Sequence, residues 1–168
     1  ELENLMPDYL DRLLFDDIPF LQQAQIEHDF FAETLKKNKV EVLYLEDLAA
    51  ETLQSAEDKE VFLNSYLDET MIHDDFMRNE VFDFFMSIKD PRTFIDHTMA
   101  GLKKNELALP QRLNLTSLVA ENYPFLIDPM PNLYFTRDPF ATIGNSVSMN
   151  RMYAPTRRRE TLYGNQIY

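Results

Sequence analysis

The spacing of apolar residues in the N-terminal part of the chain predicts a helix followed by a strand. From Phe20 to Leu35 apolar positions recur at helical intervals, and the KKNK segment that follows places cations and Asn38, a residue suited to a left-handed cap, at the helix end. Residues 40–46, VEVLYLE, are rich in β-branched and apolar side chains, which is typical of a mostly buried strand. This part of the chain therefore predicts a helix-then-strand unit.

The middle of the chain predicts a series of short helices. Apolar residues at helical spacing recur there behind residues that cap or begin a helix. The predicted helices are residues 48–54 behind Asp47, a helix carrying Phe62 and Tyr66 behind Ser55 and Asp58, residues 75–89, a helix from Asp90 and Pro91 to near Gly101, and residues 116–123. We expect these helices to form a five-helix bundle.

The C-terminal part returns to a strand pattern. Residues 141–150, ATIGNSVSMN, predict a hairpin that turns at Gly144 and Asn145, and a last helix is expected to start at Pro155 or Thr156. The pattern as a whole indicates a helical bundle inserted between two strand-containing pieces. The fold class expected is α/β, with this chain predominantly helical.

Composition narrows the classes of protein to consider. The chain has 168 residues, of which 45% are hydrophobic, enough for the core of one domain or two small ones. The net charge of −13 argues against a nucleic-acid partner. The sequence contains no run of about 18 apolar residues, so no membrane span is predicted. The absence of cysteine excludes a disulfide scaffold and a thiol nucleophile within the chain, and it favours the cytoplasm. The ends, ELENL and GNQIY, suggest a piece of a longer protein.

A proline-rich segment, IDPMPNLYFTRDPF at residues 127–140, carries the first candidate chemistry. Asn132, Phe135 and Asp138 are spaced three apart, so in a left-handed extended helix with three residues per turn they would share one face. An amide, an aromatic ring and a carboxylate on one face suit a planar cation such as a guanidinium group. The alternative is that Arg137 and Asp138 form an ordinary surface ion pair.

Three consecutive arginines, Arg157 to Arg159, are the second candidate. They fall in the first turn of a predicted helix, where the helix dipole disfavours cations. A bound carboxylate or other anion would compensate, and pairing with the acidic helices is the alternative that stays open. The three histidines do not stand at metal-ligand spacing, so no metal site is predicted.

The sequence DPMPNLYFTRDPFATIGNSVSMNRMYAPTRRRETLYG resembles bacterial arginine deiminase, and LLFDD at residues 13–17 and TMAG at residues 98–101 fit the same family. The resemblance implies a five-bladed α/β propeller of the guanidine-modifying (pentein) superfamily with an inserted helical bundle. It divides the chain into residues 1–46 as the first part of the propeller, 47–122 as the bundle, and 123–168 as the return to the propeller.

The resemblance also implies hydrolysis of L-arginine to L-citrulline and ammonia without a cofactor. Asp138 would be the catalytic carboxylate that binds the guanidinium group and Phe135 would lie beside the substrate. Asn132 would lie near its amino-acid end, the backbone of Leu14 would supply contacts to the substrate, and Arg157 would bind its carboxylate.

The nucleophilic Cys and the catalytic His of the family lie outside this chain, so the chain alone is expected to be inactive and to self-associate, whereas the parent protein is expected to be a homo-oligomer. Two other functions stay open: a hydrolase of agmatine or methylated arginine, and a non-catalytic acidic helical interaction module.

Overall fold

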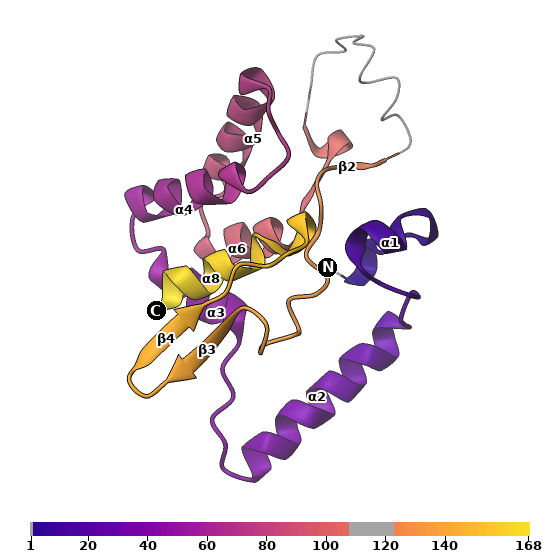
Figure 1. Ribbon diagram of the computed structural model, residues 1–168, viewed down its shortest axis with the longest axis vertical. Helices are drawn as coiled ribbons and strands as arrows, with labels where there is room; N and C mark the ends of the chain where they lie inside the picture. Colours follow the sequence, from indigo (N-terminus) through magenta and orange to yellow (C-terminus); the bar gives the residue numbers. More distant parts are fainter. Residues whose placement is uncertain (1, 108–122) are drawn as a thin grey trace.

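Helices form most of the structure, a computed structural model that describes residues 2–107 and 123–168 (Figure 1). The α-helices are α1 (Leu10–Leu13), α2 (Leu21–Lys37), α3 (Leu45–Thr52), α4 (Ala56–Asp68), α5 (Asp75–Ser87), α6 (Pro91–Ala100) and α8 (Glu160–Ile167). Short 3₁₀ turns are η1 (Leu2–Asn4), η2 (Pro7–Tyr9), η3 (Lys104–Glu106) and η4 (Pro155–Arg157). The prediction of a predominantly helical chain is confirmed.

The helix predicted from Phe20 is confirmed as α2, but its end differs from the prediction. Asn38 has φ −87° and does not take the left-handed conformation, which falls on Lys39 at φ 62°. The Asn38 amide instead donates a hydrogen bond to the carbonyl of Thr34 at 2.8 Å. The side chain thus gives a carbonyl of the last helical turn a second donor, beside the backbone N–H of Asn38, and the left-handed residue follows one position later.

The strand predicted at residues 40–46 is wrong. These residues join α2 to α3 without pairing to a strand anywhere in the part of the chain that the structure describes, and α3 begins already at Leu45. A strand needs a neighbour to bond its N–H and C=O groups, so apolar and β-branched composition alone does not make one.

The caps predicted for the bundle are confirmed for α4 and α6. The Ser55 hydroxyl accepts a hydrogen bond from the backbone N–H of Asp58, whose carboxylate accepts one from the N–H of Ser55. Asp90 accepts a hydrogen bond from the N–H of Thr93, and Pro91 is the first residue of α6. The helix predicted at residues 116–123 lies outside the described residues, apart from its last position.

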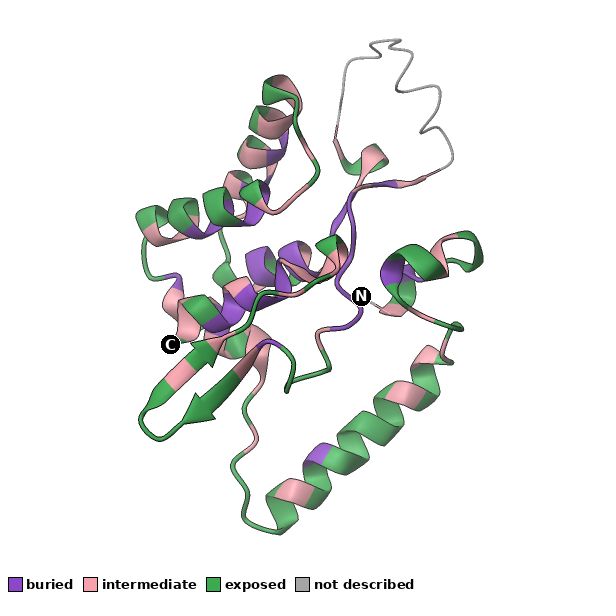
Figure 2. Ribbon diagram, in the orientation of Figure 1, coloured by how far each residue is buried: buried purple, intermediate pink, exposed green. Residues whose placement is uncertain are grey.

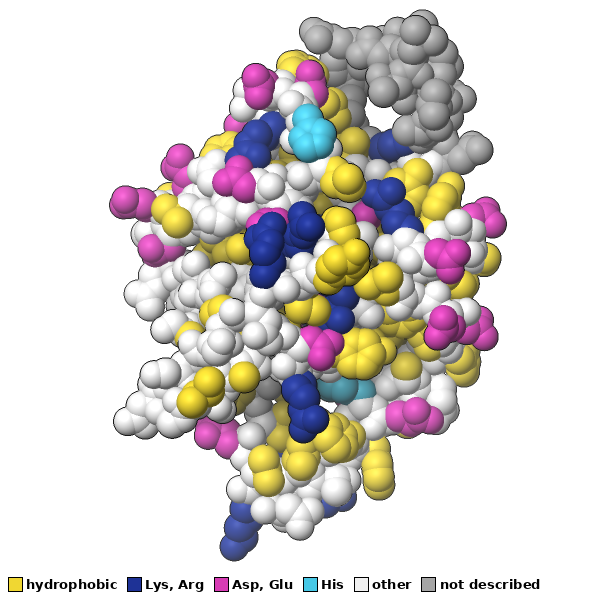
Figure 3. All heavy atoms as spheres, in the orientation of Figure 1, with side chains coloured by type: hydrophobic (Ala, Val, Ile, Leu, Met, Phe, Trp, Pro, Cys, Tyr) yellow, Lys and Arg dark blue, Asp and Glu magenta, His cyan; other side chains and the backbone are white. Residues whose placement is uncertain are grey.

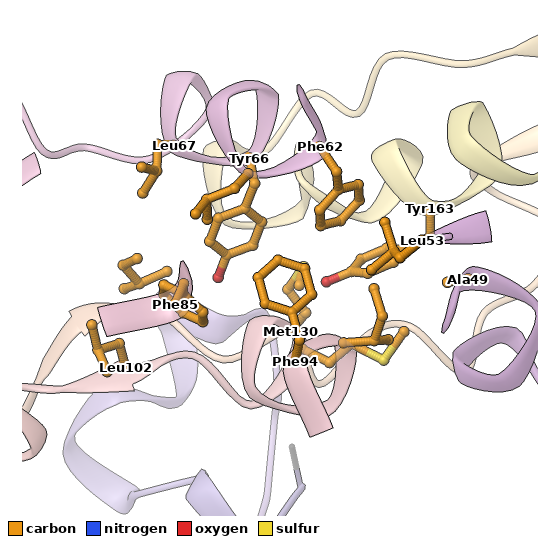
Figure 4. Close-up of a cluster of buried hydrophobic side chains, with 14 of the residues drawn as sticks. Ala49, Leu53, Phe62, Tyr66, Leu67, Phe85, Phe94, Leu102, Met130 and Tyr163 are labelled. Atoms are coloured by element: carbon orange, nitrogen blue, oxygen red, sulfur yellow. The ribbon is translucent and has the colours of Figure 1, made fainter. Parts of the chain in front are cut away.

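Aromatic side chains from several helices form the centre of the core (Figure 4). Phe62 and Tyr66 of α4 pack against Phe85 of α5, Phe94 of α6 and Tyr163 of α8, with ring centroids 5.5 to 6.3 Å apart. Figure 2 shows that the buried faces of these helices turn inward, whereas most of α2 is exposed. Residues 127, 130 and 163 belong to the same core as residues 49–102. The bundle and the C-terminal part therefore share one core, and the three-part division stays a prediction.

Two small antiparallel sheets complete the structure. Strand β1 (Leu102–Lys103) pairs with β2 (Phe125–Ile127), and β3 (Phe140–Ile143) pairs with β4 (Ser146–Met149). The hairpin predicted at residues 141–150 is confirmed, and Gly144 takes the positive φ of 61° at its turn. Within residues 2–107 and 123–168 no sheet closes into a propeller. Nor is any helix there long and apolar enough to cross a membrane.

Candidate functional site

The proline-rich segment folds as a succession of turns and not as the left-handed extended helix that was predicted. The N–H of Leu133 donates to the carbonyl of Met130 at 3.3 Å, and the N–H of Phe135 donates to that of Asn132 at 3.1 Å. A left-handed extended helix leaves such groups to water, so these bonds exclude it. As a result Asn132 is buried, whereas Phe135 and Asp138 are exposed, and the three side chains do not share one face.

Asn132 fixes the turn that follows α1. Its side-chain amide, 5% exposed, donates a hydrogen bond to the carbonyl of Leu13 at 2.9 Å. The next residue, Leu14, ends α1 in the left-handed conformation at φ 60° and ψ 42°, which is strained for a residue with a side chain. Two predicted site residues, Asn132 and Leu14, are thus brought side by side, and the bond to Leu13 stabilises that strained turn.

The other three predicted site residues meet in one cluster. Nη1 of Arg157 donates to a carboxylate oxygen of Asp138 at 3.0 Å, and the guanidinium carbon lies 5.7 Å from the centre of the Phe135 ring. The centre of the Tyr134 ring lies 4.0 Å from the centre of the Phe135 ring, so the two rings pack against each other. A carboxylate and an aromatic ring here hold a guanidinium group.

Glu160 is a member of this cluster that the sequence reasoning missed. Both of its carboxylate oxygens accept from Nε of Arg157 at 3.0 Å, and one lies 2.8 Å from Nη2 outside hydrogen-bond alignment. Its side chain is fully buried and begins α8. The signal available in the sequence was the spacing of three between Arg157 and Glu160 at the start of a helix.

In this buried setting, Arg157 and Glu160 each stabilise the charged form of the other side chain. Burial acts to lower the pKa of Arg157, but Glu160 and Asp138 outweigh it and raise that pKa above its ordinary value. Burial raises the pKa of Glu160 above its ordinary value, against the opposite effect of Arg157. The negative charge expected beside the arginines is therefore supplied, at Arg157, by Asp138 and Glu160 of the C-terminal segment itself.

Arg159 anchors the segment to the bundle. It is 3% exposed, and its guanidinium donates to the Tyr66 hydroxyl at 2.9 Å and to the carbonyl of Asp128 at 2.7 Å. The hydroxyl of Tyr66 in turn donates to the carbonyl of Thr98 at 2.8 Å. Because Arg159 lies two residues after Arg157, this buried network sets where the start of α8 stands relative to Asp138.

The middle of the face drawn in Figure 3 differs from the rest of that face in its charge. In Figure 3, Lys and Arg side chains gather there beside hydrophobic side chains, whereas Asp and Glu lie mostly toward the edges. The residues that the structure describes contain no group of three or more His, Cys, Asp or Glu side chains able to hold a metal ion. The groups available for chemistry at the cluster are thus two carboxylates, a guanidinium and aromatic rings.

Comparison with known proteins gives a single answer. The sequence profile of the family described as arginine deiminase matches residues 11–168. The chain is 59% identical to an arginine deiminase of Streptococcus sanguinis (strain SK36), 58% to one of Streptococcus gordonii and 56% to one of Streptococcus agalactiae. Each match covers 100% of this chain and 42% of the relative.

The mostly helical fold and the cluster that holds a guanidinium group thus belong to a protein of the pentein fold class. The chain is a member of the arginine deiminase family, as the resemblance indicated, and it spans about two fifths of the length of the curated relatives that it matches.

Proposed function

We propose that the complete protein of which this chain forms part hydrolyses L-arginine to L-citrulline and ammonia. The observation that carries the proposal is the binding of a guanidinium group, that of Arg157, between the carboxylate of Asp138 and the ring of Phe135. A guanidinium is also the reacting group of arginine, so the same two side chains suit the substrate. The names of the relatives, and identities of 56 to 59%, support the assignment.

The proposed roles follow from the chemistry of each side chain. Asp138 holds the guanidinium nitrogens and keeps the planar group oriented, while the ring of Phe135 packs on it. Arg157 binds the substrate carboxylate through Nη1, the nitrogen that pairs with Asp138 in the structure. Asn132 lies near the amino-acid end of the substrate, and the backbone of Leu14 contacts the substrate; the hydrogen bond from Asn132 to the carbonyl of Leu13 supports a shared role for the two residues.

The remaining chemistry requires groups outside this chain, which has no cysteine. The family resemblance implies that a Cys thiolate attacks the guanidinium carbon, that ammonia leaves as a His supplies a proton, and that water then releases citrulline and the thiol. It also implies that the segments flanking the bundle are parts of a five-bladed α/β propeller. The absence of cysteine supports a cytoplasmic protein. We therefore propose that the 168-residue chain alone is inactive.

The test is citrulline release from L-arginine by the complete protein, with Asp138→Ala beside the wild type. We expect the substitution to lower kcat/KM by about two orders of magnitude or more, because it removes the carboxylate charge that Asp138 places against the guanidinium in the proposed site. Asp83→Ala, at an exposed position of α5, is the matched control and is expected to have no effect. Turnover unaffected by Asp138→Ala in a folded protein would contradict the proposal.

Hydrolysis of agmatine or of a methylated arginine is the second candidate, because Asp138 and Phe135 suit any guanidinium. Agmatine lacks the carboxylate that Arg157 would bind. Equal kcat/KM values for agmatine and L-arginine would favour this candidate. The third reading, a non-catalytic acidic interaction module, would gain support if the complete protein turned over no guanidino compound.

We also propose that the isolated chain self-associates through α2. Phe30 and Phe31 are 72% and 62% exposed, and Ile26 on the same helix is 63% exposed, which leaves an apolar surface for a second copy to cover. Light scattering after size exclusion should show species larger than a monomer, and Phe30→Asn should reduce them. Tyr153→Asn, at a side chain 98% exposed outside α2, is the control. A clean monomer at all concentrations would contradict this proposal; the homo-oligomeric state proposed for the parent needs the complete protein.

A further inference from the structure

Glu160 is a buried carboxylate to which the proposed chemistry assigns no role. Its side chain is fully buried, and both of its oxygens accept from Nε of Arg157 at 3.0 Å. A carboxylate that faces the Nε side of a guanidinium fixes the plane and the direction of the group. Glu160 therefore determines where the two terminal nitrogens of Arg157 point.

The two carboxylates that hold Arg157 differ in their exposure. The side chain of Glu160 is 0% exposed, whereas that of Asp138 is 44% exposed and lies where a ligand can reach it. Asp138 is bound through a single nitrogen, Nη1, at 3.0 Å. Nη2 is buried and has no hydrogen-bond acceptor among the described residues. It lies 2.8 Å from a carboxylate oxygen of Glu160, with which it forms an ion pair. The pair between Nη1 and Asp138 is thus the one that a ligand can replace.

We propose that Glu160 is the positioning residue for Arg157, and that it holds Nε in place while Nη1 exchanges Asp138 for the carboxylate of the substrate. The inference rests on the proposed function. Before the substrate binds, the guanidinium group of Arg157 forms an ion pair with Asp138. When L-arginine binds, its carboxylate pairs with Arg157 and its guanidinium pairs with Asp138, so every charged group still has a partner of opposite charge.

This exchange gives the site a preference for substrates that carry both charged ends. A ligand with a guanidinium but no carboxylate must compete with Arg157 for Asp138 and offers Arg157 nothing in return. Such a ligand binds more weakly, because it must break the ion pair between Arg157 and Asp138 without supplying a new partner for Arg157. Glu160 is therefore inferred to contribute to specificity without contacting the substrate.

The experiment measures KM and kcat for L-arginine and the inhibition constant of agmatine in the complete protein. Glu160→Gln keeps the shape of the side chain and removes its charge. We expect KM for L-arginine to rise about tenfold or more with a smaller change in kcat. Agmatine should also bind more weakly, because Arg157 then pairs with Asp138 alone. Glu160→Asp, which retains a carboxylate, should recover part of the loss.

The effect of Arg157→Ala separates positioning from a structural role. This substitution should raise KM for L-arginine but lower the inhibition constant of agmatine, because Asp138 is freed. In the Arg157→Ala background, Glu160→Gln should change either constant by less than about twofold, since the group it positions is gone. The control is Glu69→Gln, which breaks a two-point pair with Arg151 away from the site and should leave both constants unchanged.

Three results would overturn the inference while leaving the proposed function intact. These are an unchanged KM in Glu160→Gln, an effect of Glu160→Gln that adds in full to that of Arg157→Ala, and an inhibition constant of agmatine that rises in Arg157→Ala. If Glu160→Gln does not fold, the same comparisons with Glu160→Asp decide. A wild-type protein that turns over no L-arginine overturns the proposed function itself, and the inference with it.

Discussion

Gly101 is the position where a single added methyl group should cost the most. It follows α6 at φ 79° and ψ −170°, a conformation that essentially only glycine adopts. A Cβ atom built there would clash with the carbonyl oxygen of Ile127 and would lie 2.8 Å from the carbonyl carbon of Asp128. Both contacts are with backbone, which cannot rotate away, so Gly101→Ala must displace β2 from the end of α6.

The expected cost has two parts. The backbone conformation contributes about 1–3 kcal/mol, and forcing a methyl group into a closed contact contributes about another 1–3 kcal/mol. The sum is a large fraction of the 5–15 kcal/mol that is usual for the whole stability of a domain. Gly144 provides the control, because it also has positive φ, at 61°, but a Cβ there would meet nothing within 4 Å. Gly144→Ala should therefore cost only about 1–2 kcal/mol.

Native-state hydrogen exchange in the complete protein measures this effect where it should occur. The N–H of Met130 donates to the carbonyl of Met99 at 3.0 Å, and the N–H of Lys104 donates to that of Pro124 at 2.8 Å, so these two amides flank the contact. Gly101→Ala should lower their free energy of opening by about 2 kcal/mol or more, and Gly144→Ala should leave them unchanged. Equal effects of the two substitutions would refute the argument from close backbone approach.

Three further predictions concern the core, a cap and pH. Tyr66→Phe should destabilise the protein by about 1–3 kcal/mol in urea unfolding, because it leaves a guanidinium N–H of buried Arg159 without its acceptor. Ser55→Ala should cost about 1 kcal/mol through loss of the capping box, whereas Ser65→Ala, at an exposed mid-helix hydroxyl, should cost less; equal losses would count against the cap. Burial raises the pKa of Glu160 in the folded state above its ordinary value of 4.5, so the folded state binds more protons than the unfolded state. The contribution of Glu160 to stability should therefore be complete below pH 4.5 and should fall as the pH rises through the folded-state pKa. Glu160→Gln should flatten this part of the stability profile, and an unchanged slope would contradict the assignment.

Local signals in the sequence were enough for the helices of the bundle. The capping box of Ser55 and Asp58 and the Asp90–Pro91 start act within one helical turn, so nothing distant can easily override them. The hairpin at Gly144 is equally local, because its turn needs positive φ and glycine supplies it. The strand expected at residues 40–46 failed because a strand depends on a partner, and the described residues offer none.

The candidate site shows the same division between local and distant effects. The motifs containing Asn132, Phe135, Asp138 and Arg157 could be found by their residue types and by family resemblance. Their arrangement could not, because the turns at residues 131–138 bury Asn132 against Leu13 and turn the other side chains outward. The role of Glu160 was hidden since its burial depends on how α8 packs against α3 and α4.

The sequence by itself determined the family, the acidic and cysteine-free character of the chain, the helical bundle and the residue types that suit a guanidinium. Only the tertiary structure decided that Arg157 binds both Asp138 and Glu160. The physical reason is that composition and capping act over a few residues, whereas charge pairing is set by burial. Which carboxylate a buried arginine meets depends on the packing of α8 and the anchoring of Arg159 to Tyr66, contacts between residues far apart in the chain.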